Sequence, residues 1–176
     1  MNHQAIKDIL QPLVAFFGFE VTDIRITDEG DLMRVEMVSV HASRIIGWHG
    51  ETLNALQSLL KAIIRSKENL ERSPFIVLDV DGYRRMQEDK VRRIAEQKAD
   101  FVRRTGNRIA LAPMSPYFRR IVHLHVANTP ALGDLTTESV GEGEYRQVVM
   151  RLKEARGGEE LQPVISQGDG LENLDV

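Results

Sequence analysis

Hydrophobic and polar residues alternate along the chain with a spacing that changes from segment to segment. Residues 3–17 carry apolar side chains at three- and four-residue intervals, which predicts an amphipathic helix. We expect Pro12 to kink or shorten this helix and Gly18 to cap its end. Residues 19–27 and 32–40 alternate apolar and polar positions on either side of a short polar turn, which predicts a β-hairpin.

A second helical pattern follows this hairpin. Residues 53–64 place leucine and isoleucine along one helix face, and a short helical turn is expected just before them, near residues 43–46. Residues 74–82 are apolar enough to predict a buried strand. The order helix, strand, strand, helix, strand therefore indicates an α+β domain over residues 1–82, with a three-stranded sheet and helices on one face.

A long charged helix is predicted for residues 83–106, ending at Gly106. Basic residues cover much of its surface, and we interpret it as a connecting helix that holds the domain boundary. Its modest apolar stripe consists of Met86, Val91, Ile94, Ala95, Lys98 and Val102.

The region after this helix predicts a second, smaller α+β domain over residues 107–154. A short strand is expected within 107–114, followed by a helix over 115–128 with proline in its first turn. Two further strands, 135–140 and 145–152, are joined by a glycine-rich hairpin turn.

Charge is distributed unevenly, although the net charge is only −3. Residues 82–125 contain 11 basic and 4 acidic side chains, whereas both flanking regions are acidic. A basic middle in an acidic protein suggests one surface that binds a polyanion, and a solvated arginine-rich helix face explains it about as well. Residues 155–176 are acidic and lack an apolar pattern, which predicts a disordered tail.

Composition and motifs exclude several classes of protein. The chain has no cysteine, so disulfides, thiolate nucleophiles and cysteine zinc sites are excluded, and a reducing cytosol is the expected compartment. No signal peptide and no apolar run long enough for a transmembrane helix are found. His123 and His125 lack a third metal ligand at a typical spacing, so no metal is expected. Without a Walker loop, a nucleophile elbow or paired carboxylates, neither enzymatic activity nor a cofactor is expected.

The sequence Gly47-Trp48-His49-Gly50 stands at the start of the second helical pattern. A helix N-terminus favours phosphate, and glycine lets a backbone come close to a ligand. Placed after a β-hairpin, this motif resembles the loop of a KH domain in its bacterial type II arrangement, which clamps the backbone of about four nucleotides. KH domains usually carry a basic residue between the glycines, so the resemblance implies a weaker phosphate clamp here. Trp48 could stack on a base or pack against protein.

Arg119 and His123 are four residues apart in the predicted helix 115–128 and therefore share a face. This spacing, with its surroundings, resembles the R-three-H domain, in which the pair helps to bind single-stranded nucleic acid. Alternatively, Arg119 forms an ion pair with Glu138 and His123 is a satisfied buried histidine. By the same resemblance, further contacts are expected from Arg104, Arg120, Arg146 and the turn at 141–143.

Residues 3–152 together resemble the bacterial Jag (SpoIIIJ-associated) or KhpB-like family. The segments "GETLNALQ", "VLDVDGYR", "VRRTG" and "RRIVH…TTESVGEG" carry this resemblance. The chain begins almost directly at the KH helix, so the additional Jag-N domain is expected to be absent. The resemblance implies a cytoplasmic protein that binds single-stranded RNA, or single-stranded DNA, and is linked to cell elongation and division. The alternative is an adaptor that docks a partner KH protein, a second copy or the membrane-insertase machinery.

Overall fold

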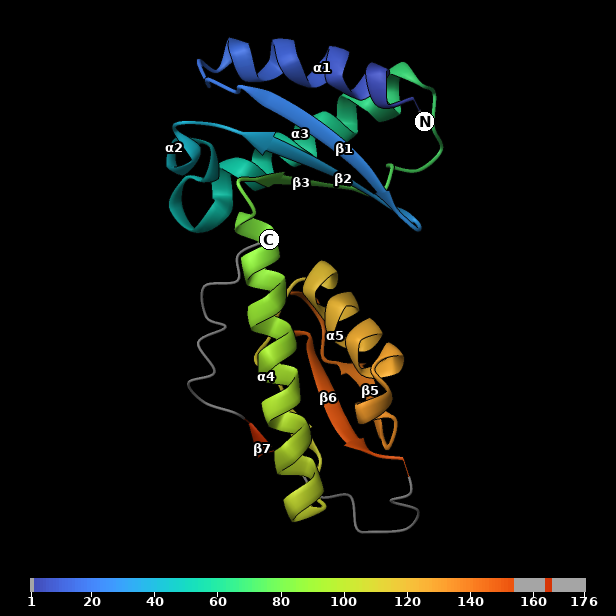
Figure 1. The fold of residues 1–176 in the computed structure, drawn as a ribbon. Helices are drawn as coiled ribbons and strands as arrows, with labels where there is room; N and C mark the ends of the chain where they lie inside the picture. Colours follow the sequence, from blue (N-terminus) through green and yellow to red (C-terminus); the bar gives the residue numbers. More distant parts are fainter. Residues whose placement is uncertain (1, 154–163, 166–176) are drawn as a thin grey trace. The chain divides into compact units, whose positions relative to one another are not determined.

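The computed structural model describes residues 2–153 and 164–165 and divides the chain into two compact units, Met1–Arg85 and Met86–Val176 (Figure 1). The first unit contains α1 (His3–Phe16), β1 (Asp23–Glu29), β2 (Leu32–Val38), α2 (Ala42–Ile46), α3 (Glu51–Lys67) and β3 (Ile76–Val80). This order matches the α+β prediction, including the short helix before the main one.

The first unit is a three-stranded sheet with its helices packed on one face. The strand order is β1-β2-β3, with β1 antiparallel and β3 parallel to β2. A parallel pair needs a crossover connection, which α2 and α3 supply between β2 and β3. The core joins apolar residues of α1 and α3 to alternate residues of the strands. Among its fully buried members are Ile6, Leu10, Val35, Met37, Leu53, Leu60, Ile76 and Leu78.

The end of α1 shows how local signals and packing combine. The helix continues past Pro12 to Phe16, so Pro12 does not shorten it. Packing of the apolar face of α1 stabilises the helix despite the missing N–H group of Pro12. Gly18 adopts a positive φ of 69°, and the N–H of Phe19 donates to the carbonyl of Val14 at 2.9 Å. Gly18 therefore ends the helix as predicted.

The second unit contains most of α4 (Tyr83–Thr105), then β4 (Ile109–Ala110), α5 (Pro116–Asn128), β5 (Leu135–Val140), β6 (Gln147–Leu152) and β7 (Val164–Ile165). Its sheet has the order β5-β6-β4-β7. β7 pairs in parallel with β4. The prediction of a disordered tail over 155–176 is therefore wrong at residues 164–165, and the rest of that segment lies outside the described residues.

The apolar face of α4 belongs to the core of the second unit. Its buried residues Val91, Ile94, Ala95, Ala99 and Val102 join a cluster with α5 and the sheet. The buried residue that continues this stripe is Ala99, and not the predicted Lys98, which is only partly buried. Met86 is wrongly placed in the predicted stripe, because 65% of its surface is exposed.

A buried polar network connects β3 to the first turn of α4. The Asp79 carboxylate accepts hydrogen bonds from the N–H groups of Val80 (2.8 Å) and Arg84 (2.9 Å) and so caps the start of α4. The Arg84 side chain, only 2% exposed, donates to the carbonyl of Leu78 (2.6 Å) and to Oδ1 of Asn54 (2.5 Å). Burial raises the pKa of Asp79, although these N–H groups oppose the shift.

Candidate nucleic-acid interface

The loop between α2 and α3 has a backbone that only glycine adopts readily at its first position. Gly47 has φ 71° and ψ −165°. A Cβ atom there would lie 2.0 Å from Oγ1 and 2.7 Å from Cβ of Thr52. The fold itself therefore requires glycine at position 47, whether or not a ligand approaches the loop.

The same loop leaves the start of α3 without a side-chain cap. A 3-10 turn, η1 (Trp48–Gly50), leads directly into Glu51, and the N–H of Glu51 donates to the carbonyl of Trp48. His49 and Gly50 both have positive φ values, 49° and 91°. Gly50 is the N-cap residue and has no side chain to bond the first N–H groups of the 17-residue helix. These N–H groups and the helix dipole favour an anion at this end.

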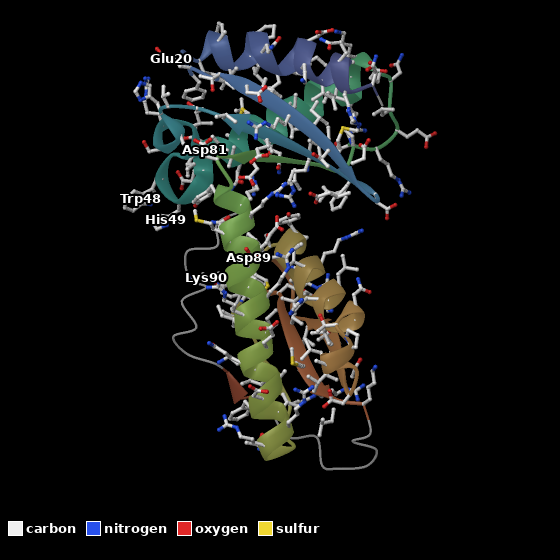
Figure 2. All side chains as sticks on the ribbon, in the orientation of Figure 1. Glu20, Trp48, His49, Asp81, Asp89 and Lys90 are labelled. Carbon is white, nitrogen blue, oxygen red and sulfur yellow. The ribbon has the colours of Figure 1, made fainter. Side chains whose placement is uncertain are left out.

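Trp48 projects from this loop, away from the core of its own unit (Figure 2). Its surface is 76% exposed. The ring makes an edge contact with His49, with ring centroids 4.5 Å apart. Packing within its own unit therefore does not account for Trp48, which leaves a base or a partner protein as its contact.

In the second unit, Arg119 and Arg146 both form hydrogen bonds with the Met114 backbone. The Arg119 guanidinium donates to the carbonyl of Met114 at 2.8 Å, and the N–H of Met114 donates to the carbonyl of Arg146 at 3.2 Å. Burial, followed by the charge of Arg146, lowers the pKa of Arg119. Within the described residues neither guanidinium forms an ion pair with a carboxylate, so the alternative pairing of Arg119 with Glu138 is not seen. We call Arg119 and Arg146 the arginine pair.

His123 faces β5 from the adjacent turn of α5. Its Nδ1 lies 2.7 Å from Oγ1 of Thr137, and its Nε2 lies 3.1 Å from Oγ of Ser139. Burial and then the charge of Arg119 lower the pKa of His123, so the ring is neutral at pH 7. Both ring nitrogens are thus engaged within the fold. This arrangement matches the alternative of a satisfied histidine, and it makes His123 a residue that holds α5 against β5.

The lowered pKa of His123 predicts a pH dependence of stability. Its stabilising contribution is present above the ordinary histidine pKa of about 6.5 and is lost as pH falls through the lower pKa of the folded state. We therefore expect the second unit to lose stability between pH 7 and pH 5, and His123→Gln to flatten this slope. Urea unfolding followed by circular dichroism measures it, with the exposed His41→Gln as control. An unchanged slope in His123→Gln would contradict the assignment.

Arg104 lies at the opposite end of the second unit from the arginine pair. Near the start of α4, Tyr117 of α5 donates to Glu88 at 2.5 Å. Near the end of α4, Arg103 pairs with Asp134, which follows α5. The two helices therefore run in the same direction.

Arg119 lies in the first turns of α5, and nine residues separate it from the helix end at Asn128, a rise of about 14 Å. The structure consequently does not bring Arg104 to the arginine pair. Arg120 is exposed and neighbours Arg119, but it lies on a different face of α5 from Arg119 and His123.

The two units correspond to two known domain types. Residues 3–74 match the KH domain of KhpA/KhpB, and residues 89–152 match the R-three-H domain. The chain therefore combines a KH domain of the KhpA/KhpB type with an R-three-H domain. Its KH domain contains the Gly47–Gly50 loop, which we call the KH loop, and its R-three-H domain contains the arginine pair.

Three proteins named RNA-binding protein KhpB are similar to this chain. The protein of Lactiplantibacillus plantarum is 35% identical over 109 residues, which cover 62% of this chain and 32% of that protein. The protein of Clostridium symbiosum is 32% identical over 123 residues (69% and 52%), and that of Bacillus subtilis is 28% identical over 132 residues (75% and 62%). The matched region thus spans between about a third and three-fifths of the length of these relatives.

Internal pairing uses much of the basic charge that the sequence concentrates in residues 82–125. Arg84 is buried, Arg92 pairs with two carboxylates of its own helix, and Arg103 pairs with Asp134 at 2.6 Å. The arginine-rich helix α4 is therefore not a uniform surface for a polyanion. Within the described ranges 2–153 and 164–165, no helix is long and apolar enough to cross a membrane, and no group of three metal-ligating side chains is found.

Sequence reasoning missed several residues of this R-three-H domain. Thr137 and Ser139 lie on the same inward face of β5 as Leu135, two and four residues further along the strand. This period-two pattern could have indicated hydroxyl partners for a histidine on the covering helix. Met114 acts through its backbone, which no side-chain pattern reports. Tyr145 is 82% exposed beside Arg146, and an aromatic residue between a glycine-rich turn and an arginine could have been singled out.

Proposed function

We propose that this chain binds single-stranded RNA at two surfaces, the KH loop and the arginine pair. The observation that carries the proposal is the arginine pair itself. Two guanidinium groups lie close enough for one charge to lower the pKa of the other, and no carboxylate among the described residues pairs with either. A phosphate group would offset this repulsion through charge-assisted hydrogen bonds. The names of the similar proteins support RNA as the nucleic acid.

The KH loop adds a different kind of contact. It lacks lysine and arginine between its glycines, so backbone N–H groups at the start of α3 supply its attraction for phosphate. The exposed Trp48 ring offers a face for one base, and such stacking is worth about 1–3 kcal/mol. The proposed activity is binding, with no residue assigned to catalysis. The absence of cysteine suits action in the cytoplasm, and a role in cell elongation and division rests on the family resemblance.

One titration tests the proposal on the full chain. A dye-labelled single-stranded RNA is titrated at several salt concentrations, with dye anisotropy reporting binding anywhere and Trp48 emission reporting contact at the KH loop. We expect anisotropy to rise, Trp48 emission to fall and affinity to decrease with salt, because phosphate contacts release counterions. The double variant Arg119→Ala/Arg146→Ala should bind about 30- to 100-fold more weakly, since hydrogen bonds to charged groups are lost. Its logarithmic salt slope should be smaller by about 1.4.

A matched charge control accompanies this variant. Arg25→Ala/Arg72→Ala removes the same two charges from exposed positions of the KH domain. If the control weakens binding as much as the double variant does, net charge and not the arginine pair explains the loss. Unchanged Trp48 emission with rising anisotropy would remove the KH loop from the proposal. No anisotropy change at low salt would contradict the proposal that this chain binds RNA.

Exposed aromatic side chains favour a second candidate function, that of a protein-interaction adaptor. Phe16 is 84% exposed and Phe17 is 47% exposed at the end of α1, where their rings make edge contact at 5.4 Å. Exposed apolar groups of this kind mark protein contacts. The proposed partners are a partner KH protein or a second copy of this chain. Loss of all RNA binding in the titration would leave this candidate, with Trp48 as a further protein contact.

A further inference from the structure

The loop from β5 to β6 presents its residues on a backbone that folds back on itself. A 3-10 turn, η3 (Gly143–Tyr145), closes the loop, and the N–H of Tyr145 donates to the carbonyl of Glu142 at 3.2 Å. Gly141 has φ 92°, and a Cβ atom there would lie 3.0 Å from the carbonyl oxygen of Tyr145. The close approach to Gly141 therefore fixes the backbone of Tyr145 immediately before the chain reaches Arg146.

Tyr145 differs from the other aromatic residues of the second unit. Phe118 is fully buried, and Phe101 and Tyr117 pack against the same apolar cluster. The Tyr145 side chain, by contrast, is 82% exposed. It sits on an ordered turn and takes no part in that cluster, so packing of the domain does not explain an aromatic ring at this position.

We propose that Tyr145 provides the aromatic face on which one RNA base stacks while the arginine pair holds the neighbouring phosphate. The inference rests on the proposed function and assigns to it a base-contacting residue. Tyr145 directly precedes Arg146, and Arg146 and Arg119 both bond to the Met114 backbone. An aromatic ring and two cations therefore occur in the same part of the domain. Binding of single strands commonly combines a positively charged surface for the backbone with an aromatic platform for bases. The R-three-H domain then contacts both parts of a nucleotide.

Two substitutions in the full chain separate stacking from other roles of Tyr145. Tyr145→Ala should weaken binding of the dye-labelled RNA about 5- to 100-fold, the range expected for one stacked base. Tyr145→Phe keeps the ring and should bind within about twofold of the wild type, because stacking needs no hydroxyl. The logarithmic salt slope should stay unchanged in both variants, since neither removes a charge. An equal loss in Tyr145→Phe would overturn stacking in favour of a hydroxyl contact.

The RNA supplies the second half of the test. Single abasic nucleotides are placed in turn along the oligonucleotide, and Tyr145→Ala should cost no further affinity at the one position where the base is already missing. The exposed Phe16→Ala, in the other unit, is the matched control and should leave affinity unchanged. Full binding by Tyr145→Ala would overturn this inference alone. Failure of the wild type to bind RNA would overturn the proposed function and this inference with it.

Discussion

Replacing Arg84 by alanine is expected to lower the free energy of unfolding of the first unit by about 3–5 kcal/mol, because two buried hydrogen bonds to a charged group are lost. Arg84 is 2% exposed and donates to the carbonyl of Leu78 and to Asn54. Without its side chain, both acceptors lose this donor inside the protein, whereas the backbone N–H of residue 84 still donates to Asp79.

Circular dichroism follows this loss, because the helix signal of α1 and α3 disappears when the first unit unfolds. Urea unfolding of Arg84→Ala is compared with that of Arg85→Ala, which removes the same charge one residue further along. The Arg85 side chain is 52% exposed, and its ion pair with Glu29 is long, at 3.9 Å. Exposed pairs contribute about 0–1 kcal/mol, so the control should unfold close to the wild type. An equal loss of unfolding free energy in both variants would show that the removed charge, and not the buried hydrogen bonds of Arg84, accounts for the effect.

Periodicity predicted the secondary structure well because it reports which side of an element is buried. The strand expected at 135–140 forms as β5 with the same bounds, and the helix expected at 115–128 forms as α5 with Pro116 in its first turn. The strand expected within 107–114 shrinks to Ile109–Ala110. Pro113 lacks the N–H group that would continue the ladder, and the chain turns away toward α5.

The candidate site was predictable only where it depends on local spacing. Four-residue spacing correctly placed Arg119 and His123 close together, since the charge of Arg119 lowers the pKa of His123. The hydroxyl partners of His123 come from β5, and only the packing of α5 on the sheet decides them. The sequence likewise did not reveal that Arg104 lies far from the arginine pair. That distance depends on the relative direction of α4 and α5, which is a property of the packed domain.

Charge counting was the least informative guide to the binding surface. It treated Arg84, Arg92 and Arg103 as equivalent to Arg119, although the first is buried and the other two are paired with carboxylates. What distinguishes Arg119 is the absence of a carboxylate partner within the described residues, together with the nearness of Arg146. These are properties of neighbours in space, which a count along the chain does not contain.

Gly47→Ala is the second substitution with a large expected effect, a loss of about 3–5 kcal/mol in the free energy of unfolding of the first unit. Two separate costs combine at this position. The φ and ψ values of Gly47 lie in a region that is nearly restricted to glycine, and the new methyl group would overlap Thr52. Gly30→Ala is the matched control, because Gly30 also has a positive φ, 64°, but a Cβ atom added there would have no other atom within 4 Å beyond its chain neighbours.

The control should lose only about 1 kcal/mol, the cost of a left-handed backbone for a residue with a side chain. Urea unfolding followed by circular dichroism compares the two variants. Similar small losses would mean that the loop relaxes around the methyl group and that Gly47 is not required by the fold. A much larger loss in Gly47→Ala would mean that the first glycine of the KH loop serves the packing of α3 whether or not RNA is present. Contacts of the KH loop with RNA should then be assigned from variants of Trp48, because replacing this exposed residue changes no core contact.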